Sequence, residues 1–117
     1  MFPVLSAGLK NKTEVMISPA LDKMKELVSE KKVYDLIFID ANKTNYPEYF
    51  EEAVKLSHQG TVIILDNMLK SGRVIEDPGD DEDLKAVQLT NDIISKDKRV
   101  ESLLMTIGDG FTISLVK

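Results

Sequence analysis

Short apolar runs rich in β-branched residues alternate along this chain with stretches in which apolar residues recur every three or four positions. This alternation of strand and helix patterns is typical of βαβ units and indicates an α/β fold with a mostly parallel sheet. The pattern predicts strands at 13–17, 34–39 and 61–65, helices at about 19–29, from Pro47, and at about 80–97, and a closing antiparallel hairpin at 100–106 and 111–116. We therefore expect a sheet of about five strands.

Turn and capping residues support these boundaries. Ser18-Pro19 provides an N-cap and a proline at the first helical position, and Gly60 ends the second helix. Gly108-Asp109-Gly110 separates the two strands of the hairpin. The helix between 13–17 and 34–39 is long enough for a right-handed crossover, so we expect these two strands to be neighbours. With 117 residues, of which 43% are hydrophobic, the chain forms a single domain over 1–117.

Composition excludes several classes of protein. The chain has no cysteine and one histidine, which excludes disulfides, thiolate zinc sites and histidine-rich metal sites. Six of the twenty acidic residues lie in 76–83, and no basic stripe occurs, which argues against nucleic-acid binding. No apolar run reaches the length of a membrane span and no secretory signal is visible, so we expect a cytoplasmic protein without a membrane partner.

Polar residues follow two of the predicted strands at the same relative place. Asp40 follows the strand at 34–39, and Asp66-Asn67 follows the strand at 61–65. Ligand sites of open parallel sheets lie beyond the carboxyl ends of the strands, so these side chains converge if the strands are neighbours. Two carboxylates and an amide oxygen suit a hard cation, Mg²⁺ first and also Mn²⁺ or Ca²⁺. The alternative is that both aspartates only cap the loops after their strands.

Lys43 lies three residues beyond Asp40 on the same loop. Near a cation and shielded from water, its ammonium should lose a proton more readily, which would make it a general base. The alternative is a solvated loop lysine. Tyr46 and Tyr49 fit the apolar face of the following helix and are interpreted as packing residues.

Several separate motifs together resemble the cation-dependent O-methyltransferases, which include the catechol and caffeoyl-CoA enzymes. The resemblance runs from about Ser6 to the C-terminus. It rests on residues 40–46 (DANKTNY), 59–60 (QG), 63–67 (IILDN), 71–74 (SGRV) and 107–110 (IGDG).

This resemblance implies a partial Rossmann-like methyltransferase fold and a homodimer. Asp40, Asp66 and Asn67 match the metal ligands, and Lys43 matches the catalytic lysine. Pro19 and Ala20 resemble the segment that meets the adenine of S-adenosyl-L-methionine, and Asp40 also belongs to that cofactor site. The implied reaction is methyl transfer to a phenolic, catechol-like or caffeoyl-CoA-like hydroxyl. There, chelation to the cation lowers the hydroxyl pKa, Lys43 takes the proton, and the oxygen attacks the methyl carbon in line.

The sequence departs from the family pattern in three ways. It resembles only the C-terminal part of the domain and lacks the glycine-rich cofactor loop. Asn42 stands where aspartate is common, and Lys70 stands where many relatives have tryptophan. Two further interpretations remain open: a catalytically inactive metal-binding or interaction module derived from this fold, and a response-regulator-like domain with a magnesium site.

Overall fold

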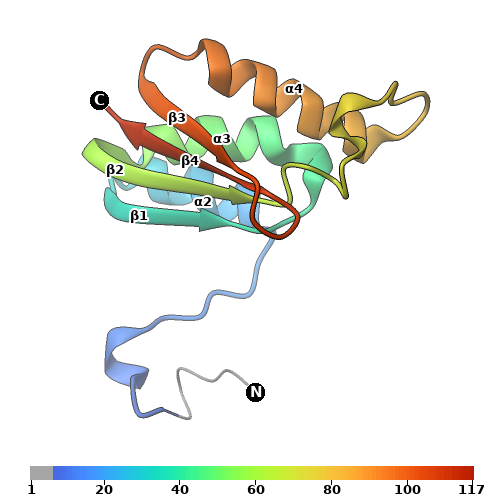
Figure 1. The fold of residues 1–117 in the computed structure, drawn as a ribbon. Helices are drawn as coiled ribbons and strands as arrows, with labels where there is room; N and C mark the ends of the chain where they lie inside the picture. Colours follow the sequence, from blue (N-terminus) through green and yellow to red (C-terminus); the bar gives the residue numbers. More distant parts are fainter. Residues whose placement is uncertain (1–6) are drawn as a thin grey trace.

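A computed structural model describes residues 7–117 as one sheet with helices packed on one of its faces (Figure 1). The strands are β1 (Tyr34–Ile39), β2 (Ser57–Asp66), β3 (Val100–Met105) and β4 (Phe111–Val116), and the α-helices are α2 (Ala20–Ser29), α3 (Tyr46–Lys55) and α4 (Glu82–Lys96). Short 3₁₀ turns are η1 (Lys10–Lys12), η2 (Lys43–Asn45) and η3 (Arg73–Ile75). The α/β class predicted from the sequence is confirmed, and the helices lie within a few residues of the predicted positions.

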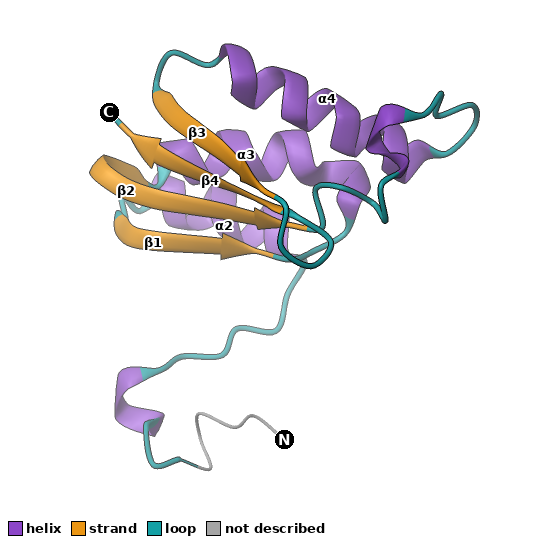
Figure 2. Ribbon diagram, in the orientation of Figure 1, coloured by secondary structure: helices purple, strands orange, loops and turns teal. Residues whose placement is uncertain are grey.

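The strand order is β1-β2-β4-β3. β1 and β2 are parallel and joined by α3, whereas β4 runs antiparallel to both β2 and β3. The closing hairpin therefore joins the sheet through its second strand, β4, which pairs with β2. Its first strand, β3, forms an edge of the sheet (Figure 2). This mixed arrangement places the carboxyl ends of β1 and β2 at one edge of the sheet, next to the β3–β4 turn.

The predicted strand at residues 13–17 is wrong. The structure gives this segment no strand, and Ile17 is 92% exposed. Within residues 7–117 the sheet consequently has four strands, with one parallel pairing and two antiparallel pairings, in place of a mostly parallel sheet of about five. The segment leads away from the sheet before α2 (Figure 1). The five residues 13–17 (TEVMI) include β-branched and apolar side chains that suit a strand, but such a segment forms a strand only where ladder hydrogen bonds and burial offset the entropy lost on ordering.

The core lies between the sheet and helices α3 and α4. Its largest fully buried side chains are Tyr46, Phe50, Ile63, Leu65, Met68, Leu84 and Val87. At the start of α4, the Asp81 carboxylate accepts a hydrogen bond of 3.0 Å from the Leu84 amide and so caps the first turn of the helix. Within residues 7–117 no helix is long and apolar enough to cross a lipid bilayer.

Candidate functional site

The carboxyl ends of β1 and β2 bring the predicted aspartates to adjacent backbone positions. In the parallel register Ile39 pairs with Leu65, so Asp40 and Asp66 are the next residues along each strand. Asp66 is the last residue of β2, and Asn67 follows with a left-handed φ of 61°. The sequence prediction that these positions share one edge of the sheet is therefore confirmed for the backbone.

Lys43 is the first residue of η2, and its side chain turns back toward the end of β1. Its Nζ donates hydrogen bonds to Asp40 Oδ1 at 3.1 Å, to the Ala41 carbonyl at 2.9 Å and to the Tyr46 hydroxyl at 2.6 Å. The Lys43 side chain is 12% exposed, while that of Asp40 is 51% exposed. Lys43 is thus a largely enclosed cation beside an accessible carboxylate, and the alternative of a solvated loop lysine is wrong.

Tyr46 connects the two strand ends. Its hydroxyl donates to the Asp66 carbonyl at 2.8 Å and also lies 3.3 Å from the Ile39 carbonyl, while it accepts from Lys43. The side chain is fully buried in the core. Tyr46 therefore holds β1, β2 and Lys43 together, a role beyond the helix packing predicted for it.

The charge environment of Lys43 is set by burial and by its hydrogen-bond partners. Burial disfavours the ammonium, but the hydrogen bonds to Tyr46 and Asp40 outweigh burial and raise the pKa of Lys43 above its ordinary value. The Tyr46 pKa is also raised, because burial disfavours the phenolate more than Lys43 stabilises it. In this state of the chain Lys43 is an ammonium group and Tyr46 a neutral phenol.

Asp109, in the turn between β3 and β4, supports the residues after β2. Its carboxylate accepts from the Asn67 side-chain amide at 3.4 Å and from the Ser71 backbone amide. The Asn67 backbone amide in turn donates to Asp66 Oδ1 at 2.8 Å. The sequence signal was the IGDG motif, which contributed to the resemblance without a role for Asp109. The structure gives it one, because it orients the amide of Asn67.

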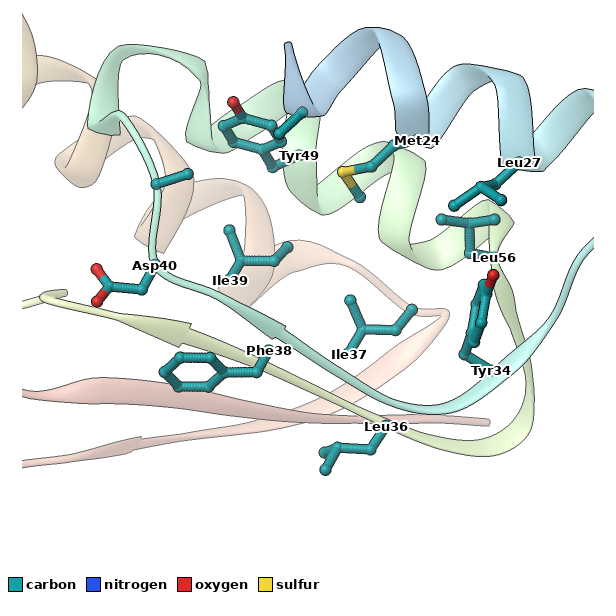
Figure 3. A pocket seen from close by; sticks show the side chains of 12 residues that line it. Met24, Leu27, Tyr34, Leu36, Ile37, Phe38, Ile39, Asp40, Tyr49 and Leu56 are labelled. Atoms are coloured by element: carbon teal, nitrogen blue, oxygen red, sulfur yellow. The ribbon is translucent and has the colours of Figure 1, made fainter. Parts of the chain in front are cut away.

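Two of the three predicted cofactor residues line one groove. Ala20 and Asp40 line one groove of about 430 Å³ between α2 and β1, together with Met24, Leu27, Ile37 and other apolar residues (Figure 3). Pro19 precedes α2 and is not among the residues that line this groove. At its end near α3, the Tyr49 hydroxyl donates to Asn42 Oδ1 at 2.7 Å. The groove is mostly apolar, with the Asp40 carboxylate at its polar end.

The donor set at the strand ends contains two carboxylates and one amide. Among residues 7–117 no group of three His, Cys, Asp or Glu side chains is suited to hold a metal ion. A cation site at this edge would therefore depend on the Asn67 oxygen as the third protein ligand. The chemistry of two carboxylates and an amide oxygen fits a hard divalent cation, since all three are neutral or anionic oxygen donors.

Comparisons of this chain with a family profile, with curated relatives and with solved structures agree with one another. The O-methyltransferase family profile matches residues 4–117. A probable caffeoyl-CoA O-methyltransferase 2 of Dictyostelium discoideum is 41% identical, over 92% of this chain and 48% of its own length. The catechol O-methyltransferase of Mycobacterium tuberculosis is 33% identical, over 95% of this chain and 51% of its own length.

Solved structures agree with these relatives. The O-methyltransferase from Bacillus cereus, solved with SAH, matches with a TM-score of 0.90 and 38% identity, over 97% of this chain and 55% of its own. TomG from Streptomyces achromogenes, solved with SAM, matches with a TM-score of 0.88 and 31% identity, over 97% of this chain and 54% of its own. The chain spans about half the length of these proteins. On this evidence, the chain belongs to the O-methyltransferase family and has the corresponding part of its Rossmann-like fold.

Proposed function

We propose that this chain forms part of an S-adenosylmethionine-dependent O-methyltransferase that acts on a hydroxyl of a catechol- or caffeoyl-CoA-like acceptor. The family and the names of its relatives support this reaction class. The observation that carries the proposal is the geometry at the two strand ends, where Lys43 contacts both Asp40 and the tyrosine that binds the end of β2. A lysine held beside accessible acidic oxygens is suited to exchange protons with a bound hydroxyl.

The cation-binding part of the proposal assigns Asp40, Asp66 and Asn67 as the protein ligands. A bound divalent cation would supply Lewis acidity, which favours the ionised form of an acceptor hydroxyl. Asp109 would restrict the Asn67 side chain, since its carboxylate accepts from the amide nitrogen and leaves the amide oxygen for a ligand. Mg²⁺ is the cation we favour, because the donors are hard oxygens.

Lys43 is assigned as the proton acceptor. In the structure its charge is stabilised by the Asp40 carboxylate and the Tyr46 hydroxyl. If Asp40 coordinated a cation, its negative charge would be less available to Lys43, and the ammonium would lose its proton more easily. Tyr46 would keep Nζ in place throughout, because its hydroxyl is anchored on the Asp66 carbonyl.

The donor site is assigned to the groove beside Ala20 and Asp40. Its apolar lining suits a flat aromatic ring, and Asp40 can accept hydrogen bonds at the polar end. S-adenosylmethionine would supply the methyl group from its sulfonium. The acceptor oxygen would gain the methyl group as the sulfur–methyl bond breaks. Residues of the chain would only position the acceptor and hold its proton.

A second candidate is a catalytically inactive module that retains the site for binding or interaction. One observation favours it: Lys43 donates to three oxygens within the chain, and these contacts stabilise the strand ends without any reaction. The two candidates share the cation site and differ in the cofactor.

Calorimetric titration of the purified chain tests the cation site and the cofactor site. The chain is titrated with Mg²⁺, and with S-adenosylhomocysteine in the presence and absence of Mg²⁺. We expect Mg²⁺ to bind, with binding lost in Asp66→Ala and retained in Asp80→Ala, a matched change in the acidic run at 76–83. Cation binding that persisted in the double variant Asp40→Ala, Asp66→Ala would show that the ligand assignment is wrong. Binding of S-adenosylhomocysteine to the chain would favour the methyltransferase over the inactive module, since only the methyltransferase needs a cofactor site.

A further inference from the structure

The turn between β3 and β4 is bound to the loop that follows β2. The Leu69 backbone amide donates to the Asp109 carbonyl at 2.9 Å, and the Met68 backbone amide donates to the Gly110 carbonyl at 3.0 Å. The contact is close, since a Cβ atom added at Gly110 would overlap the Leu69 side chain. The two segments therefore lie side by side (Figure 1), and the turn supports the residues that follow Asp66.

Three non-glycine residues of this loop have a backbone conformation that side chains disfavour. Asn67, Lys70 and Ser71 have left-handed φ values of 61°, 50° and 56°. Residues keep such values only where their surroundings hold them, and they cluster at functional sites. The Asp109 carboxylate provides part of this support, because it accepts from the Asn67 side-chain amide at 3.4 Å and from the Ser71 backbone amide. One side chain thus restrains two of the three residues.

Asp109 also distinguishes between the two orientations of the Asn67 amide. An ionised carboxylate can only accept hydrogen bonds, whereas an amide has a donor end and an acceptor end. With its nitrogen toward Asp109, the Asn67 amide donates to Asp109 Oδ2. With the amide turned over, its oxygen would face the carboxylate with no proton between them, which is unfavourable. Asp109 therefore favours the orientation that turns the amide oxygen away from it.

This orientation decides which atom Asn67 offers to a cation. Asp66 Oδ1 already accepts from the Asn67 backbone amide at 2.8 Å, and Asp40 Oδ1 accepts from Lys43 at 3.1 Å. Among residues 7–117 no cluster of three acidic, histidine or cysteine side chains is suited to hold a metal ion. A third protein ligand therefore depends on the Asn67 oxygen, since hard cations bind oxygen and the amide nitrogen is no substitute.

We propose that Asp109 is a positioning residue for the cation site, which selects the Asn67 orientation with the oxygen available to the cation. This role rests on the proposed cation site and sets the affinity of that site. Asp109 acts through Asn67 and is not itself a ligand, because its two oxygens accept from Asn67 and Ser71. Removing a residue that orients a metal ligand typically lowers metal affinity about 10- to 100-fold.

Calorimetric titration of the chain and its variants with Mg²⁺ tests this role. Asp109→Asn keeps the size of the side chain but adds a donor that can bind the Asn67 oxygen, so it should raise the Kd about ten-fold or more. Asn67→Asp offers an oxygen in either orientation, and aspartate also tolerates the left-handed conformation. In the Asn67→Asp background, Asp109→Asn should leave the Kd unchanged or lower it, because it removes the repulsion between two carboxylates.

The two backgrounds separate positioning from a general effect of charge or stability. Loss of a nearby negative charge, or a loosened turn, would weaken Mg²⁺ binding equally in both backgrounds, and that result overturns the proposal. Glu101→Gln is the matched control, because it removes one exposed carboxylate at the other end of β3. This distant, exposed charge is screened, so the control should leave the Kd within about two-fold of the original.

Nuclear magnetic resonance of the isotope-labelled, cation-free chain gives a second measurement. The Asn67 side-chain amide signals, identified by their loss in Asn67→Asp, should shift in Asp109→Asn, and the Ser71 backbone amide should exchange faster with solvent. Unchanged signals overturn the proposal. Failure of the original chain to bind Mg²⁺ overturns the proposed cation site and this role together. Binding that is lost in Asp66→Ala yet fully kept in Asp109→Asn overturns the role of Asp109 alone.

Discussion

Replacing Tyr46 by phenylalanine removes one oxygen atom and tests whether that atom holds the two strand ends. The hydroxyl donates to the Asp66 carbonyl at 2.8 Å and accepts from Lys43 Nζ at 2.6 Å, in a fully buried side chain. Tyr46→Phe would leave Lys43 with one acceptor fewer and the carbonyl without this donor, while the ring still fills its place in the core. Leaving buried polar partners unsatisfied costs about 1–3 kcal/mol, more when one of them is charged.

Tyr49→Phe provides a matched control in the same helix. Tyr49 is also buried, but its hydroxyl makes its hydrogen bond of 2.7 Å to the side chain of Asn42, which lies in a loop and is partly accessible to water. We expect Tyr49→Phe to cost about 0.5–1.5 kcal/mol, the range for an ordinary hydrogen bond. Tyr46→Phe should therefore be the more destabilising of the two by about 1 kcal/mol.

Urea unfolding followed by circular dichroism measures both variants, with the slope m compared to confirm that the same surface is exposed. For a domain of this size, each kcal/mol corresponds to a shift of about 4–8 °C in Tm. Amide exchange should also increase at the ends of β1 and β2 in Tyr46→Phe and stay unchanged in Tyr49→Phe. Equal stability of the two variants, with unchanged exchange at the strand ends, would refute the argument that Tyr46 joins the strands.

Further predictions concern activity, pH and the β3–β4 turn. Rigorously purified 117-residue chain should show no measurable methyl transfer to catechol, because it lacks the glycine-rich loop of its family; turnover by this chain would contradict that. In a full-length version, Lys43→Ala should lower the rate about 10²-fold or more, as measured by kcat. Arg99 donates to Asp97 and Glu51 and lowers the pKa of both carboxyls, so this stabilisation is present above about pH 4 and is lost as pH falls through the lowered pKa values. Arg99→Met should cost about 0.5–1 kcal/mol at pH 7 after solvent screening, and the difference should vanish in urea unfolding near pH 2. Gly110→Ala should cost about 2 kcal/mol or more in the same assay, because φ is 74° and the added Cβ would overlap the Leu69 side chain.

Features set by local sequence were predicted well. Asp40 and Asp66 follow apolar runs that read as buried strands, and the rule for parallel sheets then places them at one edge, as the register of Ile39 with Leu65 confirms. The start of α4 was predictable from its acidic first turn, because such residues cap helices by local contacts. The proximity of Lys43 to Asp40 followed from their separation of three residues.

Features that depend on distant partners were not predictable from one sequence. The 13–17 run has a strand pattern, yet whether it pairs depends on a neighbour elsewhere in the chain. Tyr46 fits an apolar helical stripe, so its pattern predicts packing and gives no indication that its hydroxyl contacts the Asp66 carbonyl. The hydrogen bond from Lys43 to that hydroxyl, which helps to raise the pKa of Lys43, is likewise not indicated by the sequence pattern.

The position of β4 inside the sheet has a consequence for synthesis of the protein. β4 is the last element described, yet it lies between β2 and β3 and pairs with both. While residues 111–116 remain in the ribosomal exit tunnel, β2 lacks its neighbour on that side and β3 has no strand to pair with. The sheet can therefore close only after this segment emerges, and a nascent chain halted before Phe111 would present β3 unpaired and β2 open on one side to chaperones and proteases.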